Sequence, residues 1–405
     1  MASTEPHRQT NSFHYFPLSK KRKISSSGTC LEDLPNEIFY EIFGYLNTND
    51  IFTEFHDLNK RFHGLLHKSE LSLKVNLSLM TEMNFQELNR EFLIPNRHRI
   101  QTLNIQNPFL IDFIFSSNEI VNKFLRLQTL IFNDVDPKSF PNILRYLALL
   151  ENLSTLIIIS TQNLEKTFTS IFRLSKLKYC KVKYQASFQN QTISFNSKLT
   201  SSIEHIVIDA DVTTDNFLSL PSCIPHLQTL FIGSLRTDLF HLSSIDINAS
   251  RWNHLAKVQI NNITIPFQEF ELISKQLFSQ LQVLRISIFH HDEEYLNARR
   301  WEELIINSMS KLRSFDFQYE TQFGTEITSE NVHTKYKRIL NDFSSSFWAE
   351  RTWLFDYNYS LSQKHSMFTV IFYSINFKRY VGNKLIDYYS VCLFVIEKNT
   401  YWIKI

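Results

Sequence analysis

Apolar residues recur along the central part of the chain in one repeated frame. Each copy is apolar at its first, fourth and sixth positions, as in Ile100–Ile105. Nine copies start at intervals of 24 to 31 residues, a near-constant period that is typical of a solenoid. They begin at Ile100, Leu127, Leu153, Leu177, Ile203, Leu227, Leu255, Leu281 and Leu312. Because side chains alternate along a strand, the fourth and sixth positions are expected to point inward from a short strand.

The segments between the copies are long enough to hold helices. Four of them have a helical pattern, at Pro141–Leu150, Leu164–Leu174, Phe267–Phe278 and Ala298–Met309. One unit cannot bury its own apolar face, so the units are expected to stack, with a parallel sheet on the concave side and helices outside. The fold class predicted from this pattern is α/β. A βαβ-type domain without true repeats is the alternative.

The repeated frame resembles a leucine-rich repeat. An asparagine or cysteine is expected at the ninth position of that repeat, where its side chain hydrogen-bonds the backbone of the turn. Here other residues occupy the position: Pro108, Val135, Thr161, Gln185, Asp211 and Leu235. The resemblance therefore implies an irregular solenoid with uneven curvature.

The period lapses after about Gln318. The pattern then predicts a helix over Thr334–Phe343 and three strands, at Trp353–Tyr359, Met367–Ile375 and Tyr388–Ile396. Solenoids need terminal caps, and an antiparallel sheet in this region would cover the last repeat.

A second pattern, with a helical period, covers residues 34–66. One apolar stripe holds Leu34, Ile38, Ile42 and Leu46, and a second stripe beside it holds Phe39 and Phe43. A polar break at 47–50 separates this helix from two shorter ones. So small a unit buries too little surface to be self-sufficient, so it needs a partner protein, the rest of the chain, or both. We expect the phenylalanine stripe to pack against the unit's own second and third helices.

This unit resembles the F-box. The matching residues, at matching spacings, are Leu34-Pro35, Glu37-Ile38, Ile42-Phe43, Tyr45-Leu46, Asp50-Ile51, Leu58, Arg61-Phe62 and Leu65. Phe62 stands where the family more often has tryptophan. The resemblance implies docking onto the small adaptor of a cullin–RING (SCF-type) ubiquitin ligase, and through it onto a cullin. The adaptor-binding residues that it implies are Leu34, Pro35, Ile38, Ile42, Leu46 and Ile51. An ordinary three-helix subdomain is the alternative.

These patterns divide the chain into five parts. They are a disordered tail at 1–29, the F-box at 30–69, a partly helical transition at 70–98, the leucine-rich-repeat-like solenoid at 99–320 and a C-terminal cap at 321–405. The tail holds a basic run, Lys20–Lys23, which is either a nuclear localisation signal or a solvated charge cluster.

Composition narrows the function classes. The chain is 43% hydrophobic with a formal net charge of +2, which argues against attraction of its whole surface to nucleic acid. We expect no signal peptide and no membrane span, because no apolar run approaches the roughly 20 residues that cross a bilayer. Cys30, Cys180, Cys223 and Cys392 have no paired spacing, which fits a reducing compartment. The expected location is cytoplasmic, nuclear or both.

The glycines argue against the common nucleotide-binding enzymes. No two of the six lie within ten residues of each other, so neither a phosphate-binding loop nor a GxSxG turn is present. We expect no catalytic residue and no cofactor. The run His290–Glu294 and the pair His63 and His67 invite a metal assignment. The run is contiguous, and the pair also fits one face of an ordinary helix, so we expect no metal site at either.

The concave face is the best candidate for a target-binding site. There the third, fifth and seventh positions of each repeat strand are expected to point to solvent. Several are apolar, and a contiguous exposed apolar patch usually marks an interaction site. The expected target-binding residues are Ile131, Ile157, Ile159, Tyr179, Lys181, Lys183, His205, Val207, Phe231, Lys257 and Arg285. The alternative is that the C-terminal sheet or a loop covers this face.

The helical unit and the repeat face together predict a substrate receptor. The helices would hold the adaptor and the repeats would hold a target protein, while ubiquitin transfer is catalysed elsewhere in the assembly. The alternative is a ligase-independent interaction scaffold, with the helical unit packed against the chain itself. A nucleic-acid-binding repeat protein is a third alternative, which rests on the lysines and arginine of the concave face and on the basic run, and near-neutral charge argues against it.

Overall fold

The structure is a computed structural model that describes residues 31–375, apart from 47, 57, 69–71, 78–81, 162–166, 185–194, 196–199, 238–250, 324–328 and 363–366. The tail at 1–29, with its basic run, and the strand expected at Tyr388–Ile396 lie outside the described residues. Among the residues that are described, no helix is both long enough and apolar enough to cross a membrane.

One twelve-stranded sheet runs through the described part of the chain. Each strand from β1 to β10 lies parallel beside the next in sequence, and β12 then pairs antiparallel with both β10 and β11. The strands are β1 (Leu73–Asn76), β2 (Ile100–Ile105), β3 (Thr129–Asn133), β4 (Thr155–Ser160), β5 (Tyr179–Tyr184), β6 (His205–Thr213), β7 (Thr229–Arg236), β8 (Lys257–Ile263), β9 (Val283–Phe289), β10 (Ser314–Phe323), β11 (Phe355–Ser362) and β12 (Met367–Ser374). The predicted α/β class with a largely parallel sheet is confirmed.

The strand register carries the repeated frame across the sheet. Fourth positions pair with one another in an unbroken row that starts at Leu103 and Leu130 and ends at Leu284 and Phe315. In all nine copies, the side chains at the first, fourth and sixth positions are at most 8% exposed. If one strand slipped by one residue, all of its buried apolar side chains would turn to the other face of the sheet. The shared apolar positions therefore fix this register.

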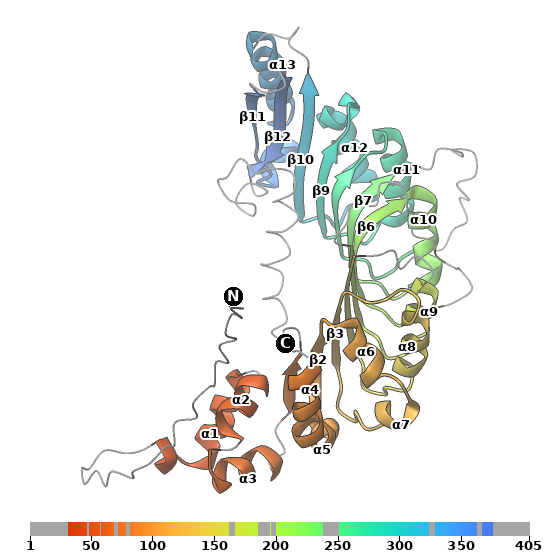
Figure 1. Ribbon diagram of the computed structural model, residues 1–405. Helices are drawn as coiled ribbons and strands as arrows, with labels where there is room; N and C mark the ends of the chain where they lie inside the picture. Colours follow the sequence, from red (N-terminus) through yellow and green to blue (C-terminus); the bar gives the residue numbers. More distant parts are fainter. Residues whose placement is uncertain are drawn as a thin grey trace, which may run out of the picture.

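Helices fill most of the connections and lie on the outer side of the curved sheet (Figure 1). They are α6 (Pro108–Ile114), α7 (Asn118–Val121), α8 (Phe140–Leu147), α9 (Phe168–Phe172), α10 (Thr214–Cys223), α11 (Phe267–Leu277) and α12 (Ala298–Ser308). Polar side chains begin several of them. Asn107, Thr213 and Asn297 each accept a hydrogen bond from a backbone N–H of the first turn. All four helices predicted between the copies are present.

An aromatic cluster closes the C-terminal end of the sheet, beside α13 (Ser329–Asp342) and α14 (Ser346–Glu350). The ring of Phe343 lies 4.9 Å from Trp348, 4.7 Å from Phe355 and 5.1 Å from Phe372, measured between ring centres. Trp348 is fully buried. Two of the three predicted cap strands, β11 and β12, are present and antiparallel.

Three short helices form the N-terminal unit: α1 (Asn36–Tyr45), α2 (Thr48–Phe55) and α3 (Lys60–Lys68). A 3₁₀ turn, η1 (Leu31–Asp33), precedes them. The phenylalanine stripe forms the core of the unit, since Phe39 meets Phe62 edge-on at 4.7 Å and Phe43 meets Phe55 at 5.2 Å. The prediction that this stripe faces the unit's own second and third helices is confirmed.

The transition at 70–98 is partly helical, as expected, but it also contains the strand β1, which pairs with β2 and begins the sheet. After β1 come α4 (Glu82–Leu88), a π-helix (Asn89–Leu93), α5 (Ile94–Asn96) and a 3₁₀ turn (Arg97–Arg99). The apolar residues Leu73, Val75 and Leu77 alternate with polar ones. That period of two is the pattern of a strand, which was not predicted because it lies outside the repeated frame.

The N-terminal unit packs against the start of the sheet. The Thr48 hydroxyl donates a hydrogen bond to the Lys74 carbonyl of β1, with 2.7 Å between the oxygens. The rings of Phe52 in α2 and Phe92 in the π-helix lie 5.5 Å apart, and one hydrophobic core continues from the unit into the sheet. Part of the apolar surface of the unit is therefore covered by its own chain.

Gly233 lies opposite a bulge between β6 and β7. Asp209 and Ala210 of β6 together face this single residue of β7. A Cβ added at Gly233 would lie 2.7 Å from the backbone nitrogen of Ala210. We expect Gly233→Ala to lower the free energy of unfolding by about 1–3 kcal/mol, because the backbone of the bulge must move.

Gly64→Ala in α3 is the matched control, since a Cβ there meets nothing within 4 Å. Alanine in the middle of a helix is expected to raise the free energy of unfolding by about 0.5–1 kcal/mol. Urea unfolding measures both changes. Equal shifts in the two variants would contradict the close approach at Gly233.

Candidate protein-binding surfaces

The leucine and isoleucine stripe of α1 reaches the surface at its N-terminal end. Pro35 stands immediately before α1 with a φ of −58°, where its missing N–H costs nothing. Pro35 is exposed and Ile38 is 40% exposed, whereas Leu34, Ile42 and Leu46 are half-buried and touch the core. The stripe therefore both supports the unit and presents an apolar patch.

Arg61 of α3 fixes the chain where it enters α1. Its guanidinium donates to the Leu34 carbonyl at 2.5 Å, to the Asn36 side chain at 2.8 Å and to the Glu32 carbonyl. It also lies 5.3 Å from the centre of the Phe39 ring. Because a planar fork makes several such bonds at once, Arg61 holds the start of the exposed patch in one geometry.

Ile51 was expected to bind the adaptor, but the structure buries its side chain. It is 3% exposed and lies in the core of the N-terminal unit, so it is not available to a second protein. Ile51 was assigned to the surface from its position in the F-box-like pattern alone. It is buried because α2 packs against β1. The unit instead exposes three apolar side chains outside the predicted set, Leu31, Tyr45 and Leu58.

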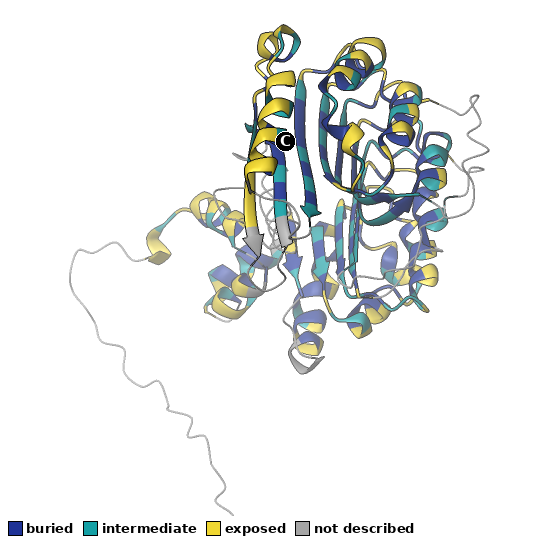
Figure 2. Ribbon diagram, turned by 90° about the horizontal axis from the view of Figure 1, so that it is seen from above, coloured by how far each residue is buried: buried dark blue, intermediate teal, exposed yellow. Residues whose placement is uncertain are grey.

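The expected target-binding residues lie in rows on the face of the sheet that is opposite its outer helices. We call this the open face, made by the third, fifth and seventh positions of the repeat strands. The fifth-position row runs Asn104, Ile131, Ile157, Lys181, Val207, Phe231, Gln259, Arg285 and Asp316. Tyr179 and His205 pair in the row on one side, and Ile159 and Lys183 in the row on the other. Figure 2 shows the resulting alternation of buried and half-buried residues along the strands.

Phe231 was expected to be exposed on this face, but the structure buries it. It is only 7% exposed, whereas Ile131, Ile157, Ile159 and Val207 are half-buried. Neighbouring strands lie about 4.8 Å apart, so flanking side chains leave little of a large ring accessible. The apolar part of the open face therefore centres on the isoleucines of β3 and β4.

Two of the four cations on the open face have acidic partners. Lys183 lies 3.9 Å from Asp209, and Arg285 lies 2.7 Å from the nearly buried Asp316. Within the described part of the chain, Lys181 and Lys257 have no carboxylate within 4 Å. Burial lowers the pKa of both lysines, and the neighbouring cations Lys183 and Arg285 lower it further. An acidic group from a partner would relieve this repulsion.

Tyr179 and His205 add uncharged polar rings beside these lysines. Burial raises the pKa of Tyr179 to about 12 and lowers that of His205. Both rings are therefore neutral at physiological pH. They give the open face hydrogen-bonding groups without additional charge.

The His290–Glu294 run forms a turn in which its polar groups have structural roles. The Asp292 carboxylate accepts from the backbone N–H of Phe267 at 2.8 Å and from that of Glu294 at 3.0 Å. The His290 Nδ1 accepts from the Asp292 N–H at 3.0 Å. These bonds begin α11 and a 3₁₀ turn, η5 (Glu293–Leu296). The polar groups of the run therefore hold the backbone of this turn and the start of α11.

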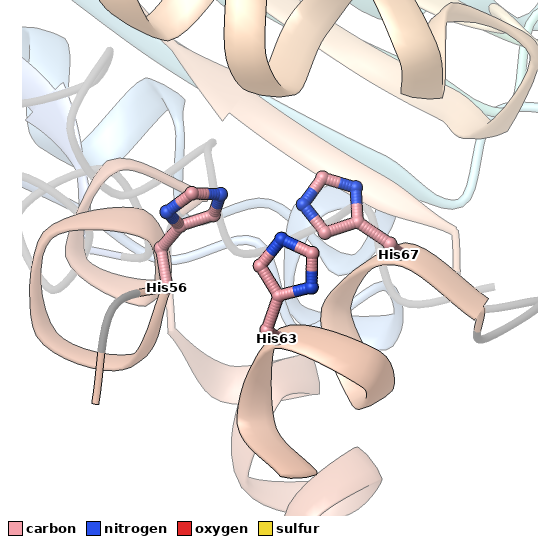
Figure 3. Close-up of side chains that lie close together, drawn as sticks. All are labelled: His56, His63 and His67. Atoms are coloured by element: carbon pink, nitrogen blue, oxygen red, sulfur yellow. The ribbon is translucent and has the colours of Figure 1, made fainter. Parts of the chain in front are cut away.

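A third histidine, His56, lies beside the pair His63 and His67. His56, in the turn after α2, brings its ring against both of them (Figure 3). The helical spacing of the pair gave no sign of His56, because it comes from a different element. In the sequence, the only sign of this group is that the three histidines lie within a stretch of twelve residues.

No known protein-family model matches the chain, and no curated protein matches it either.

Proposed function

We propose that this chain is the substrate-recognition subunit of a cullin–RING (SCF-type) E3 ubiquitin ligase, acting in the cytoplasm, the nucleus or both. The N-terminal unit is the F-box that docks on the adaptor, and the open face of the repeats binds a target protein. The chain is not itself an enzyme, because its part is to bring the target close to the catalytic subunits. The observation that carries the proposal is the exposed Pro35–Ile38 patch, on a helix whose neighbouring stripe, Phe39 and Phe43, is buried in the core of the unit.

The repeats support the second half of the proposal. Strands that follow each other in sequence lie side by side, and equivalent positions pair across them. This is the arrangement expected of leucine-rich-repeat-like units that bury their apolar faces by stacking. The N-terminal unit covers one end and the antiparallel β11 and β12 cover the other, so a rigid body would separate the adaptor from the target.

A ligase-independent scaffold is the second candidate function. It is favoured by the packing of the N-terminal unit on its own sheet, through Thr48 on Lys74 and Phe52 on Phe92. In that case the helices serve only to close the first repeat. The two candidates differ in one respect, which is whether the Pro35–Ile38 patch ever meets another protein.

Co-purification tests the proposal directly. The full chain is co-expressed with the SCF adaptor and analysed by size-exclusion chromatography and mass measurement. We expect one adaptor per chain and recruitment of the cullin when it is added. A folded chain that stays separate from the adaptor would sink the receptor proposal and leave the scaffold.

A substitution on the open face tests target binding. Ile157→Asp places a charge among the half-buried isoleucines of β3 and β4. We expect the yield of proteins captured under proteasome inhibition to fall at least tenfold, because desolvated apolar contacts at an interface centre dominate binding. Adaptor binding should be unchanged.

Leu272→Asp, on the outer helix α11, is the matched control because Leu272 is an exposed apolar residue on the opposite side of the sheet. Its captured proteins should equal those of the unchanged chain. Equal losses in both variants would show that the open face is not the binding surface.

A further inference from the structure

Three histidines meet at the junction of two elements in the N-terminal unit. His56 follows α2, whereas His63 and His67 lie one turn apart on α3. The ring centres are 5.1 Å apart for His56 and His63, 5.4 Å for His56 and His67, and 4.4 Å for His63 and His67. One ring nitrogen from each lies within 4.8 Å of the others. Among the described residues, this is the only group of three or more potential metal ligands that converges in this way.

The buried nitrogen of His67 points to a missing ligand. Its Nε2 is shielded from solvent, and no hydrogen-bond partner for it lies within reach among the described atoms. A buried polar atom without a partner costs about 1–3 kcal/mol, and native proteins rarely leave one in place. A metal ion between the three rings would satisfy this nitrogen.

Burial lowers the pKa of His67, and the neighbouring His63, His56 and Arg99 lower it further. Arg99 directs donors at the Leu66 carbonyl (2.6 Å) and the Asn96 side chain (2.7 Å).

We propose that His56, His63 and His67 bind one divalent transition-metal ion of the zinc class. Three imidazoles without a carboxylate favour zinc, copper or nickel over magnesium or calcium. Tetrahedral Zn–N bonds of about 2.0–2.1 Å place ligand nitrogens ~3.4 Å apart. Since no two of the three ligand nitrogens are more than 4.8 Å apart, the gaps must close by at most about 1.4 Å, a movement within the reach of side-chain rotation.

The exposure of the three rings sets the form of the site. His56 is buried, His67 is half-buried and His63 is exposed. The ion would thus sit at the edge of the unit, with its fourth position open to water. It would join α2 to α3 beside Phe52, whose ring lies 4.5 Å from His56, and Phe92, whose ring lies 5.9 Å from His67. The site does not depend on the proposed ligase function.

Titration of the full chain with zinc tests the site. The protein is freed of metal with a chelator and titrated with ZnCl₂ in a calorimeter, and thermal unfolding is followed with and without zinc. We expect one ion per chain and a higher melting temperature in its presence, because a ligand of the folded state stabilises it. His63→Ala should weaken zinc binding at least 100-fold, more than the loss caused by removing an outer-shell group. The exposed position of His63 allows this variant to fold.

Two controls make the result specific. His291→Ala removes an exposed histidine of the His290–Glu294 run and should leave affinity and stoichiometry unchanged. Cobalt replacing zinc should give the absorption of a tetrahedral nitrogen site without a sulfur charge-transfer band, which distinguishes these ligands from cysteines. Absence of zinc binding, unchanged affinity in folded His63→Ala, or a sulfur band would each overturn the proposal.

Discussion

Replacing Ile38 with aspartate is expected to weaken the binding of the SCF adaptor strongly while leaving the chain folded. Ile38 is the exposed isoleucine of the α1 patch, next to Pro35 and to the chain entry that Arg61 holds. An apolar anchor at the centre of an interface typically contributes 2 kcal/mol or more, and an introduced charge adds a desolvation cost. Affinity should therefore fall by about 30-fold or more. Calorimetry or surface plasmon resonance with purified adaptor measures the change.

Ile306→Asp is the control for Ile38→Asp. Ile306 is also an exposed isoleucine on a helix, but it lies on α12, far along the sheet from the N-terminal unit (Figure 1). Its substitution should leave adaptor affinity within twofold of the original. Circular dichroism should show both variants folded, since surface substitutions usually change stability by about 0.5 kcal/mol or less. Retained affinity in Ile38→Asp would mean that the exposed patch is not the docking surface.

The sheet could be predicted in detail because one physical rule repeats nine times. Each copy buries the same three positions, so the sequence defines the strand, its inward side and its register together. The fifth-position row is recovered residue by residue, from Ile131 beside Ile157 to Arg285 beside Asp316. The four helices predicted between the copies are also present, because each connection must cover the row of buried side chains on the sheet.

Burial on the outward faces could not be predicted in the same way. Alternation states which side of a strand a residue occupies, but its exposed fraction depends on the neighbours. Phe231 is outward by alternation and yet nearly buried between Val207 and Gln259. Ile51 lies in a family motif and yet packs into the core, because α2 turns toward β1. Both errors come from contacts between separate elements, which a pattern along one element does not contain.

The histidine group was hidden for the same reason. The spacing of His63 and His67 fits a helix face with or without a metal, and only the turn after α2 brings His56 to them. The strand β1 was missed differently, since its alternating Leu73, Val75 and Leu77 were visible but stood outside the repeated frame.

One hydrophobic core continues from the N-terminal unit into the sheet that carries the open face. Buried side chains connect the N-terminal unit, through Phe52 and Phe92, to the first repeat strands. Close-packed interiors transmit displacement rather than absorb it. The N-terminal unit is therefore expected to hold a fixed orientation relative to the open face, which is what a receptor needs in order to present a bound target at one distance.

Phe39→Ala is expected to cause one of the largest losses of stability among alanine substitutions in the N-terminal unit. Phe39 is fully buried, touches Phe62 edge-on at 4.7 Å and lies under the Arg61 guanidinium. Removing a buried phenylalanine ring costs about 3–5 kcal/mol, a large part of the 5–15 kcal/mol that stabilises a typical domain. Urea unfolding should show this loss, and hydrogen exchange should show it first in α1, α2 and α3.

Tyr45→Ala provides the matched control, because Tyr45 is an aromatic residue on the same helix that is 92% exposed. It should change stability by about 0.5 kcal/mol or less. The comparison also separates folding from docking, since Ile38 and Phe39 are adjacent in sequence but point in directions about 100° apart on α1, so that Ile38 is exposed and Phe39 is buried. Ile38→Asp should lose the adaptor without losing stability, whereas Phe39→Ala should lose stability first and the adaptor as a consequence. If Phe39→Ala were as stable as Tyr45→Ala, the phenylalanine stripe would not be the core of the unit, and the assignment of the neighbouring leucine and isoleucine stripe to a partner would fail with it.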